Sequence, residues 1–183
     1  MMKHFFQRYS YESVHLFLNQ FAIGLFGTSL AFASNAAGST VLSVITTVFS
    51  ILFLFFLQFL AMWKVGSNDR IACDLGKRKR NYFIPLFMWL LSNSVLYLLT
   101  FFIGIASLFP KGSFMEDIGG VANAARLFLD GMYLWILSLK VGGEPLNSHW
   151  FVYLLTPLPV LPVIYLGYVL GINNIKLKKE KKK

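Results

Sequence analysis

The sequence predicts an all-α integral membrane protein, a helical bundle of five hydrophobic segments that makes four or five crossings. Of its 183 residues, 56% are hydrophobic and 14% are charged, whereas about 25% are charged in an average soluble domain. Residues 13–63, 81–110 and 150–175 contain no Asp, Glu, Lys or Arg. A membrane-spanning helix needs about 20 apolar residues, so each stretch is long enough for one or two. We therefore expect residues 1–183 to form a single membrane domain with almost nothing outside the bilayer.

The first charge-free stretch predicts two helices, at about 13–33 and 41–63, because the small and polar residues 34–40 divide it. A cleaved signal peptide is the alternative, since Ala31-Phe32-Ala33 resembles a cleavage site. Polar side chains at Glu12, His15, Asn19 and Gln20 interrupt the approach to the apolar run. We therefore expect an uncleaved first helix.

The linker at residues 64–82 carries the strongest orientation signal. It holds six basic and two acidic residues, a net charge of +4, and short loops rich in Lys and Arg stay in the cytoplasm. Lys3 and Arg8 agree, because two crossings separate them from this loop. We expect the N-terminus and the basic loop to be cytoplasmic and the host membrane to be a bacterial cytoplasmic membrane.

Three further segments are predicted at about 83–109, 121–139 and 150–172, and the last contains Pro157, Pro159 and Pro162. The lysine-rich tail 176–183 also favours the cytoplasm, which requires an even number of crossings after the basic loop. Because proline removes helix hydrogen bonds, residues 150–172 are the candidate for a re-entrant segment. A kinked crossing with the tail outside remains equally open. A short similarity between residues 63–66 (Trp-Lys-Val-Gly) and 139–142 (Leu-Lys-Val-Gly) favours cytoplasmic ends for both segments two and four.

Polar side chains inside the membrane segments are the candidate site residues, because each costs free energy unless it is satisfied. In the fourth segment a spacing of three, four and three residues places four of them on one helical face. Arg126 and Asp130 can pair with each other there. The hypothetical ligand site comprises Asn123, Arg126, Asp130, Tyr133, Asn93, Tyr97, Asn19 and His15. Interhelical hydrogen bonding without a ligand is the alternative role for each of them.

The remaining patterns exclude several functions. The sequence has no His-Glu-x-x-His, Cys-x-x-Cys, P-loop or Gly-x-Ser-x-Gly pattern, so we expect neither an enzyme nor a bound metal or cofactor. The basic run Lys77, Arg78, Lys79 and Arg80 lacks the interleaved aromatics of nucleic-acid binders. We expect it to contact anionic lipid headgroups instead.

The expected partners are the lipid bilayer and either another membrane protein or a second copy of the chain, and not nucleic acid. We expect a transport-related membrane protein, either a substrate-binding or an accessory subunit, with a polar cavity among its helices. The alternative is a structural or regulatory partner subunit with no ligand of its own.

Overall fold

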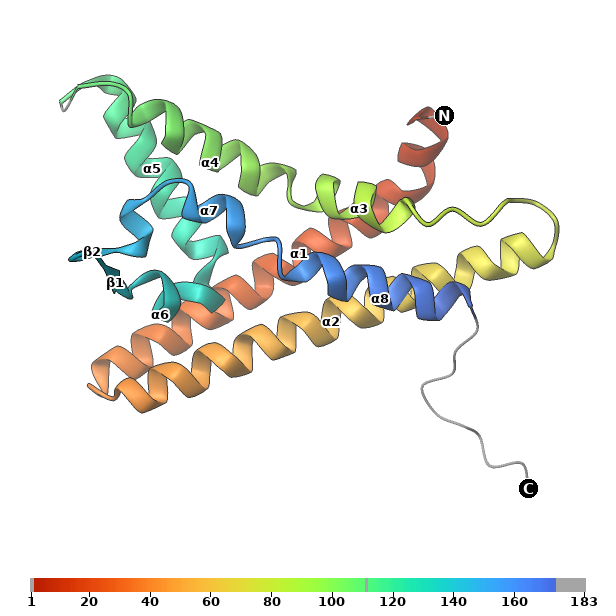
Figure 1. Cartoon of the computed structure of the whole chain (residues 1–183), viewed down its shortest axis with the longest axis horizontal. Coiled ribbons are helices and arrows are strands. Elements are labelled where there is room, and N and C mark those ends of the chain that lie inside the picture. The colour runs from red at the N-terminus through yellow and green to blue at the C-terminus, as the bar shows by residue number, and fades with distance from the viewer. Residues whose placement is uncertain (1, 111, 174–183) are drawn as a thin grey trace.

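A computed structural model describes residues 2–110 and 112–173, with side chains from Phe5 onward. Its longest elements are α1 (Met2–Ala36) and α2 (Thr40–Asp74), which pack side by side as an antiparallel hairpin (Figure 1). Gly38 lies in the tight turn between them with a positive φ of 63°, and the Ser39 hydroxyl caps α2 by accepting from the Leu42 amide. Both helices are longer than the expected 13–33 and 41–63. The expected basic loop therefore begins as helix, because α2 continues to Asp74.

The third expected segment is a broken helix. It consists of α3 (Ile84–Ser92) and α4 (Ser94–Ala106), whose axes differ in direction by 52° across Asn93. The side-chain amide of Asn93 donates to the Trp89 carbonyl of α3 at 2.9 Å. The Asn93 backbone amide donates to the same carbonyl at 3.0 Å, so the side-chain bond shares its acceptor with the backbone ladder at the bend.

The fourth expected segment, 121–139, does not form one helix. After α5 (Phe114–Leu129) the chain turns through the 3₁₀ helix η1 (Gly131–Tyr133) into the short α6 (Leu134–Leu137). Figure 1 shows that α6 leads back toward the end of the molecule at which α5 began. A two-residue hairpin follows, β1 (Lys140–Val141) with β2 (Glu144–Pro145).

The expectation of one helix at residues 121–139 is therefore wrong, because the chain reverses its direction within that range. The reversal follows Asp130-Gly131, and Asp-Gly is a turn-forming pair. Gly131 is also needed at this position, because a Cβ there would clash with the Gly24 carbonyl and the Thr28 hydroxyl of α1.

After η2 (Leu146–Ser148), the fifth expected segment contains α7 (Val152–Leu155) and α8 (Val160–Ile172), which are separated at residues 156–159. Together, residues 152–172 are long and apolar enough to cross a membrane. α8 packs closely along α2, and glycines permit this: Gly167 lies against the Phe59 carbonyl and Gly171 against the Trp63 carbonyl. The tail 176–183 lies outside the described residues.

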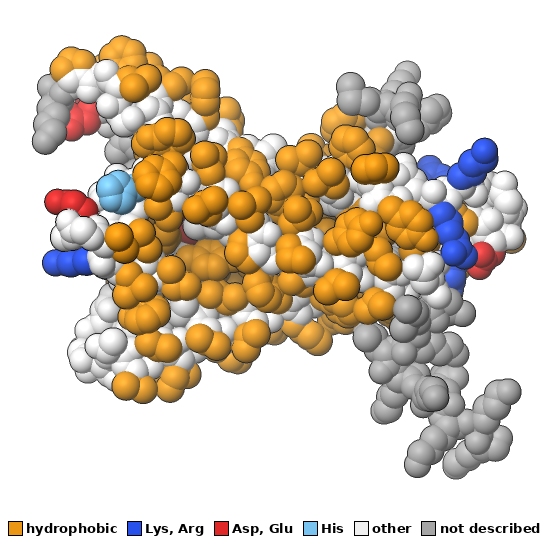
Figure 2. All heavy atoms as spheres, viewed as in Figure 1, with side chains coloured by type: hydrophobic (Ala, Val, Ile, Leu, Met, Phe, Trp, Pro, Cys, Tyr) orange, Lys and Arg blue, Asp and Glu red, His pale blue; other side chains and the backbone are white. Residues whose placement is uncertain are grey.

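Three helices among the described residues are long and apolar enough to cross a membrane, or four if the bent α3–α4 pair is one span. This indicates a membrane-integral all-α protein, although the expected count of five segments is not confirmed. Figure 2 shows hydrophobic side chains over the middle of the molecule and most of the visible Lys and Arg side chains at one end.

The two ends of the molecule have different connections (Figure 1). The start of α1, the α2–α3 connection and the end of α8 lie at one end, here called the basic end. The α1–α2 turn, the α4–α5 connection and the β1–β2 hairpin lie at the other, here called the hairpin end. The similar stretches 63–66 and 139–142 therefore end at opposite ends: Gly66 lies inside α2, whereas Gly142 lies in the hairpin turn.

Candidate functional site

Three interrupted helices meet inside the bundle. The interruptions are Asn93 between α3 and α4, residues 130–133 between α5 and α6, and residues 156–159 between α7 and α8. The Trp89 indole donates to the Pro157 carbonyl at 3.1 Å, which joins the first to the third. Arg126 and Asp130 of the second contact Thr156 of the third. We call this meeting point the break junction.

A fully buried ion pair lies at the break junction. Arg126 Nη2 is 3.2 Å from Asp130 Oδ2, and both side chains have no exposed surface. The Thr156 hydroxyl links the pair, since it accepts from Arg126 Nη2 at 2.7 Å and donates to Asp130 Oδ2 at 3.0 Å. The Arg126 guanidinium also lies 5.6 Å from the centre of the Tyr153 ring. Mutual compensation of this kind is what allows two charges to remain away from water.

The proline at position 157 explains part of this arrangement. In a regular helix the Tyr153 carbonyl would accept from the amide four residues later, but that residue is Pro157, which has no amide hydrogen. Arg126 Nη2 donates to the Tyr153 carbonyl at 2.8 Å instead. The Tyr153 hydroxyl in turn donates to Asn123 Oδ1 at 2.8 Å. Residues on α5 therefore hold the break between α7 and α8 in place.

Several polar atoms at the break junction are buried and have no hydrogen-bond partner among the described residues. They are Arg126 Nε and Nη1, Asp130 Oδ1, the Tyr133 hydroxyl and Asn93 Oδ1. A buried polar group without a partner costs about 1–3 kcal/mol. The junction consequently presents both hydrogen-bond donors and acceptors to any water or polar solute that enters it.

The structure brings some of the expected site residues together and separates others. Asn123, Arg126 and Asp130 share one network with Tyr153 and Thr156, two residues that the sequence analysis did not select. Tyr133 and Asn93 are buried at two of the interruptions, but they form no hydrogen bond with this network. Tyr97 packs its ring edge-on against Trp89, Asn19 is half-buried and His15 is exposed on α1.

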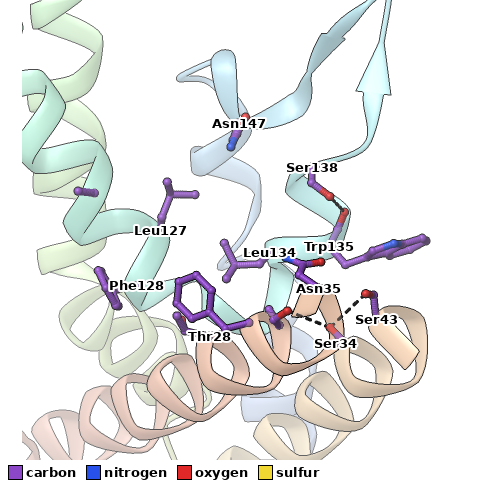
Figure 3. A pocket seen from close by; sticks show the side chains of 13 residues that line it. Thr28, Ser34, Asn35, Ser43, Leu127, Phe128, Leu134, Trp135, Ser138 and Asn147 are labelled. Atoms are coloured by element: carbon purple, nitrogen blue, oxygen red, sulfur yellow. Dashed lines mark hydrogen bonds between the residues drawn. The ribbon is translucent and has the colours of Figure 1, made fainter. Parts of the chain in front are cut away.

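A pocket of about 380 Å³ opens near the break junction, at the hairpin end. Figure 3 shows its polar side chains, which come from α1, the start of α2, the residue that follows α6, and η2. These polar residues are uncharged: Thr28, Ser34, Asn35, Ser43, Ser138 and Asn147. Thr28 also touches the backbone at Gly131, next to Asp130. One lining residue of this hairpin-end pocket therefore contacts the residue that follows Asp130.

A second polar cluster surrounds Asp69 at the basic end. The carboxylate accepts from Arg8 Nη2 at 2.6 Å, from the Tyr9 hydroxyl at 2.7 Å and from the Tyr168 hydroxyl at 3.0 Å. Arg78 donates to the Tyr9 hydroxyl at 2.9 Å and lies 4.0 Å from the carboxylate. This Asp69 cluster ties α1, α2, α8 and the α2–α3 connection together.

From the sequence alone, Asp69 is expected only as one of the charges of the loop 64–82. A signal was present, because Gln58, Met62, Val65 and Asp69 continue the buried face of α2 at spacings of four, three and four.

Within the described residues, no three His, Cys, Asp or Glu side chains gather in a way that could hold a metal ion. Comparisons with protein-family models, with curated proteins and with solved structures found no match for the chain.

Proposed function

We propose that this chain is a small transport-related membrane subunit that binds a polar solute at the break junction. The observation that carries the proposal is the meeting of three interrupted helices around a buried ion pair that keeps unused donors and an unused acceptor. In many transporters the substrate site lies near the middle of the membrane, where discontinuous helices free backbone groups. Polar and charged residues inside a membrane are expensive, and function is the common reason for their presence.

The hairpin-end pocket supplies an entrance in this proposal. Its uncharged hydroxyl and amide groups suit a small polar solute, and its inner wall at Thr28 lies beside the Asp130-Gly131 turn. The solute passes from this pocket to the unused polar atoms of Arg126, Asp130 and Tyr133. In this proposal the route opens by a movement of α6, which joins α5 through residues 130–133 and packs on α1 and α2.

The proposal includes an orientation. Arg8 and the basic run 77–80 lie at the basic end, whereas Glu116, Asp117 and Glu144 lie in elements of the hairpin end. The excess of Lys and Arg assigns the basic end to the cytoplasm. The hairpin-end pocket then opens to the outside of a bacterial cytoplasmic membrane.

The test uses purified protein in liposomes and radiolabelled glycine, glycerol and acetate as probes of zwitterionic, neutral and anionic solutes. Asn35→Leu and Asn147→Leu remove polar groups from the hairpin-end pocket, and Ser148→Ala, an exposed position outside the pocket lining, is the control. We expect one solute class to be taken up by the wild type and by Ser148→Ala and to be lost in the two pocket variants at unchanged thermal stability. Equal uptake in all variants contradicts the proposed route.

A structural or regulatory partner subunit is the second candidate. It is favoured by the bond from Arg126 to the Tyr153 carbonyl, because this bond gives the buried cation a structural role without any solute. This candidate predicts co-purification with one defined membrane protein, and no uptake or thermal stabilisation with any of the three probes.

A further inference from the structure

A groove of about 610 Å³ lies at the basic end, between the start of α1 and the α3 helix. One wall is apolar and contains Phe5, Phe6, Phe87, Leu90 and Leu91. The other end of the groove carries the polar groups of the Asp69 cluster together with Arg78 and Lys79. Its volume falls in the range of about 300–1,000 Å³ that is usual for small-molecule sites. We call it the basic-end groove.

The end of the groove that carries Asp69, Arg78 and Lys79 is here called its mouth. The charges at this mouth do not cancel. Asp69 is its one carboxylate among the lining residues, and Arg8 already pairs with it at 2.6 Å. Arg78 lies farther from Asp69, at 4.0 Å, and Lys79 is exposed. The mouth therefore keeps a positive excess that fits an anion, although the wall beside it is apolar.

The apolar wall of the groove is partly exposed on the surface of the protein. Phe6, Phe87 and Leu90 are each about half exposed, at 47%, 52% and 45%. Phe6 lies on α1, which is long and apolar enough to cross a membrane, and the other two lie on α3, which is so only together with α4. A molecule with an acidic head and a hydrocarbon chain fits both parts of the groove, because the head pairs with the basic mouth and the chain packs on the apolar wall. Such a molecule reaches the groove directly from the surrounding bilayer. A water-soluble anion satisfies only the mouth.

We propose that the basic-end groove binds one acidic phospholipid, with its phosphate at Arg78 and Lys79 and an acyl chain along Phe87 and Leu90. The site differs from general attraction between basic residues and headgroups, because only two of the four residues in the run 77–80 line the groove. Lys77 and Arg80 do not line it, and Arg80 donates to Asn173 instead. The proposal does not depend on the proposed function, since the break junction and the hairpin-end pocket are separate from this groove.

The first experiment counts bound lipids by native mass spectrometry of the purified chain. The probes are phosphatidylglycerol and phosphatidylcholine with identical acyl chains. We expect one tightly bound phosphatidylglycerol. Arg78→Gln with Lys79→Gln should weaken its binding by about 30-fold, since each basic residue near a bilayer surface contributes roughly a factor of five. Lys77→Gln with Arg80→Gln removes the same charge and should weaken it by less than about threefold. Equal losses in both pairs, or equal binding of the two lipids, overturn the proposal.

A second pair of variants tests the apolar wall without touching the Asp69 cluster. Ser94→Phe adds a ring at a position that lines the groove, whereas the adjacent Val95→Phe adds the same ring at an exposed position outside it. We expect Ser94→Phe to abolish tight phosphatidylglycerol binding and Val95→Phe to leave it unchanged. Binding that survives Ser94→Phe overturns the placement of the acyl chain.

The single cysteine of the chain gives an independent readout, because Cys73 lines the same groove. Phosphatidylglycerol should slow alkylation of Cys73 by N-ethylmaleimide, and phosphatidylcholine should not. Glycerol 1-phosphate separates the lipid from a soluble phosphate: we expect it neither to protect Cys73 nor to displace the lipid at millimolar concentration. Protection by glycerol 1-phosphate equal to that by the lipid overturns the assignment to a phospholipid.

Discussion

Neutralising one member of the Arg126–Asp130 pair should destabilise the protein more than replacing both. In Asp130→Asn the Arg126 charge keeps its place at zero exposure and loses the carboxylate at 3.2 Å. Breaking a buried pair in this way costs about 3–5 kcal/mol, because the remaining charge has no compensation. Arg126→Met should cost at least as much, since Asp130 then lacks its counter-charge and the Tyr153 carbonyl keeps only the Thr156 hydroxyl as a donor.

The double variant Arg126→Met with Asp130→Leu removes both charges. Its remaining cost is the loss of Arg126 as a donor to the Tyr153 carbonyl and to the Thr156 hydroxyl. These two groups keep their bond to each other at 3.2 Å, so we expect a total cost of about 1–3 kcal/mol. The two single substitutions should therefore sum to at least about 3 kcal/mol more than the double variant loses, as expected for residues in direct contact.

The assay is reversible unfolding in mixed micelles with increasing sodium dodecyl sulfate, followed by circular dichroism. It gives the free energy of unfolding of the wild type, the two single variants and the double variant. Additive losses, or a loss below about 1 kcal/mol in Asp130→Asn, would refute the reasoning, because the pair would then not act as one buried unit.

Three further changes test other contacts of the fold. Gly131→Ala should lower the free energy of unfolding by about 1–3 kcal/mol, because its Cβ would clash with α1. Gly120→Ala has open space around its Cβ and should lower it by less than about 0.5 kcal/mol. Equal effects of the two substitutions in the micelle assay would contradict the close contact at Gly131. Asp69→Asn should cost about 2–4 kcal/mol through the loss of charge-assisted bonds, and the exposed Asp74→Asn should be neutral; matching melting temperatures would refute the cluster. Trp89→Phe should lower the free energy of unfolding by about 1 kcal/mol, since the indole bond to the Pro157 carbonyl is lost. A melting temperature equal to that of the wild type would show that this bond does not stabilise the fold.

The sequence predicted the membrane-integral all-α class because charge spacing follows directly from the cost of charged groups in hydrocarbon. It also predicted that Asn123, Arg126 and Asp130 share a face, since this depends only on the helical repeat. Their partners Tyr153 and Thr156 lie about 30 residues away in sequence, and contacts at that separation depend on how the helices pack.

The path of the chain was harder to predict. Hydropathy gives the same signal for a segment that crosses and for one that enters and returns, so residues 121–139 and 150–172 were not distinguishable by composition. The difference depends on packing at Gly131 against α1 and on the bond from Arg126 that stabilises the proline break. Both are tertiary contacts, although the Asp130-Gly131 turn signal was visible in the sequence.

The most direct test of the account asks whether α5 and α6 enter and leave the membrane at the same side. Asp117→Cys and Val141→Cys, both at exposed positions of the hairpin end, are made separately in a Cys73→Ser chain and treated with a membrane-impermeant maleimide. The account predicts that both positions react from one side of the membrane and that Cys73 of the unchanged chain reacts from the other. Reaction of positions 117 and 141 from opposite sides would mean that this segment crosses the membrane, which contradicts the break junction as described.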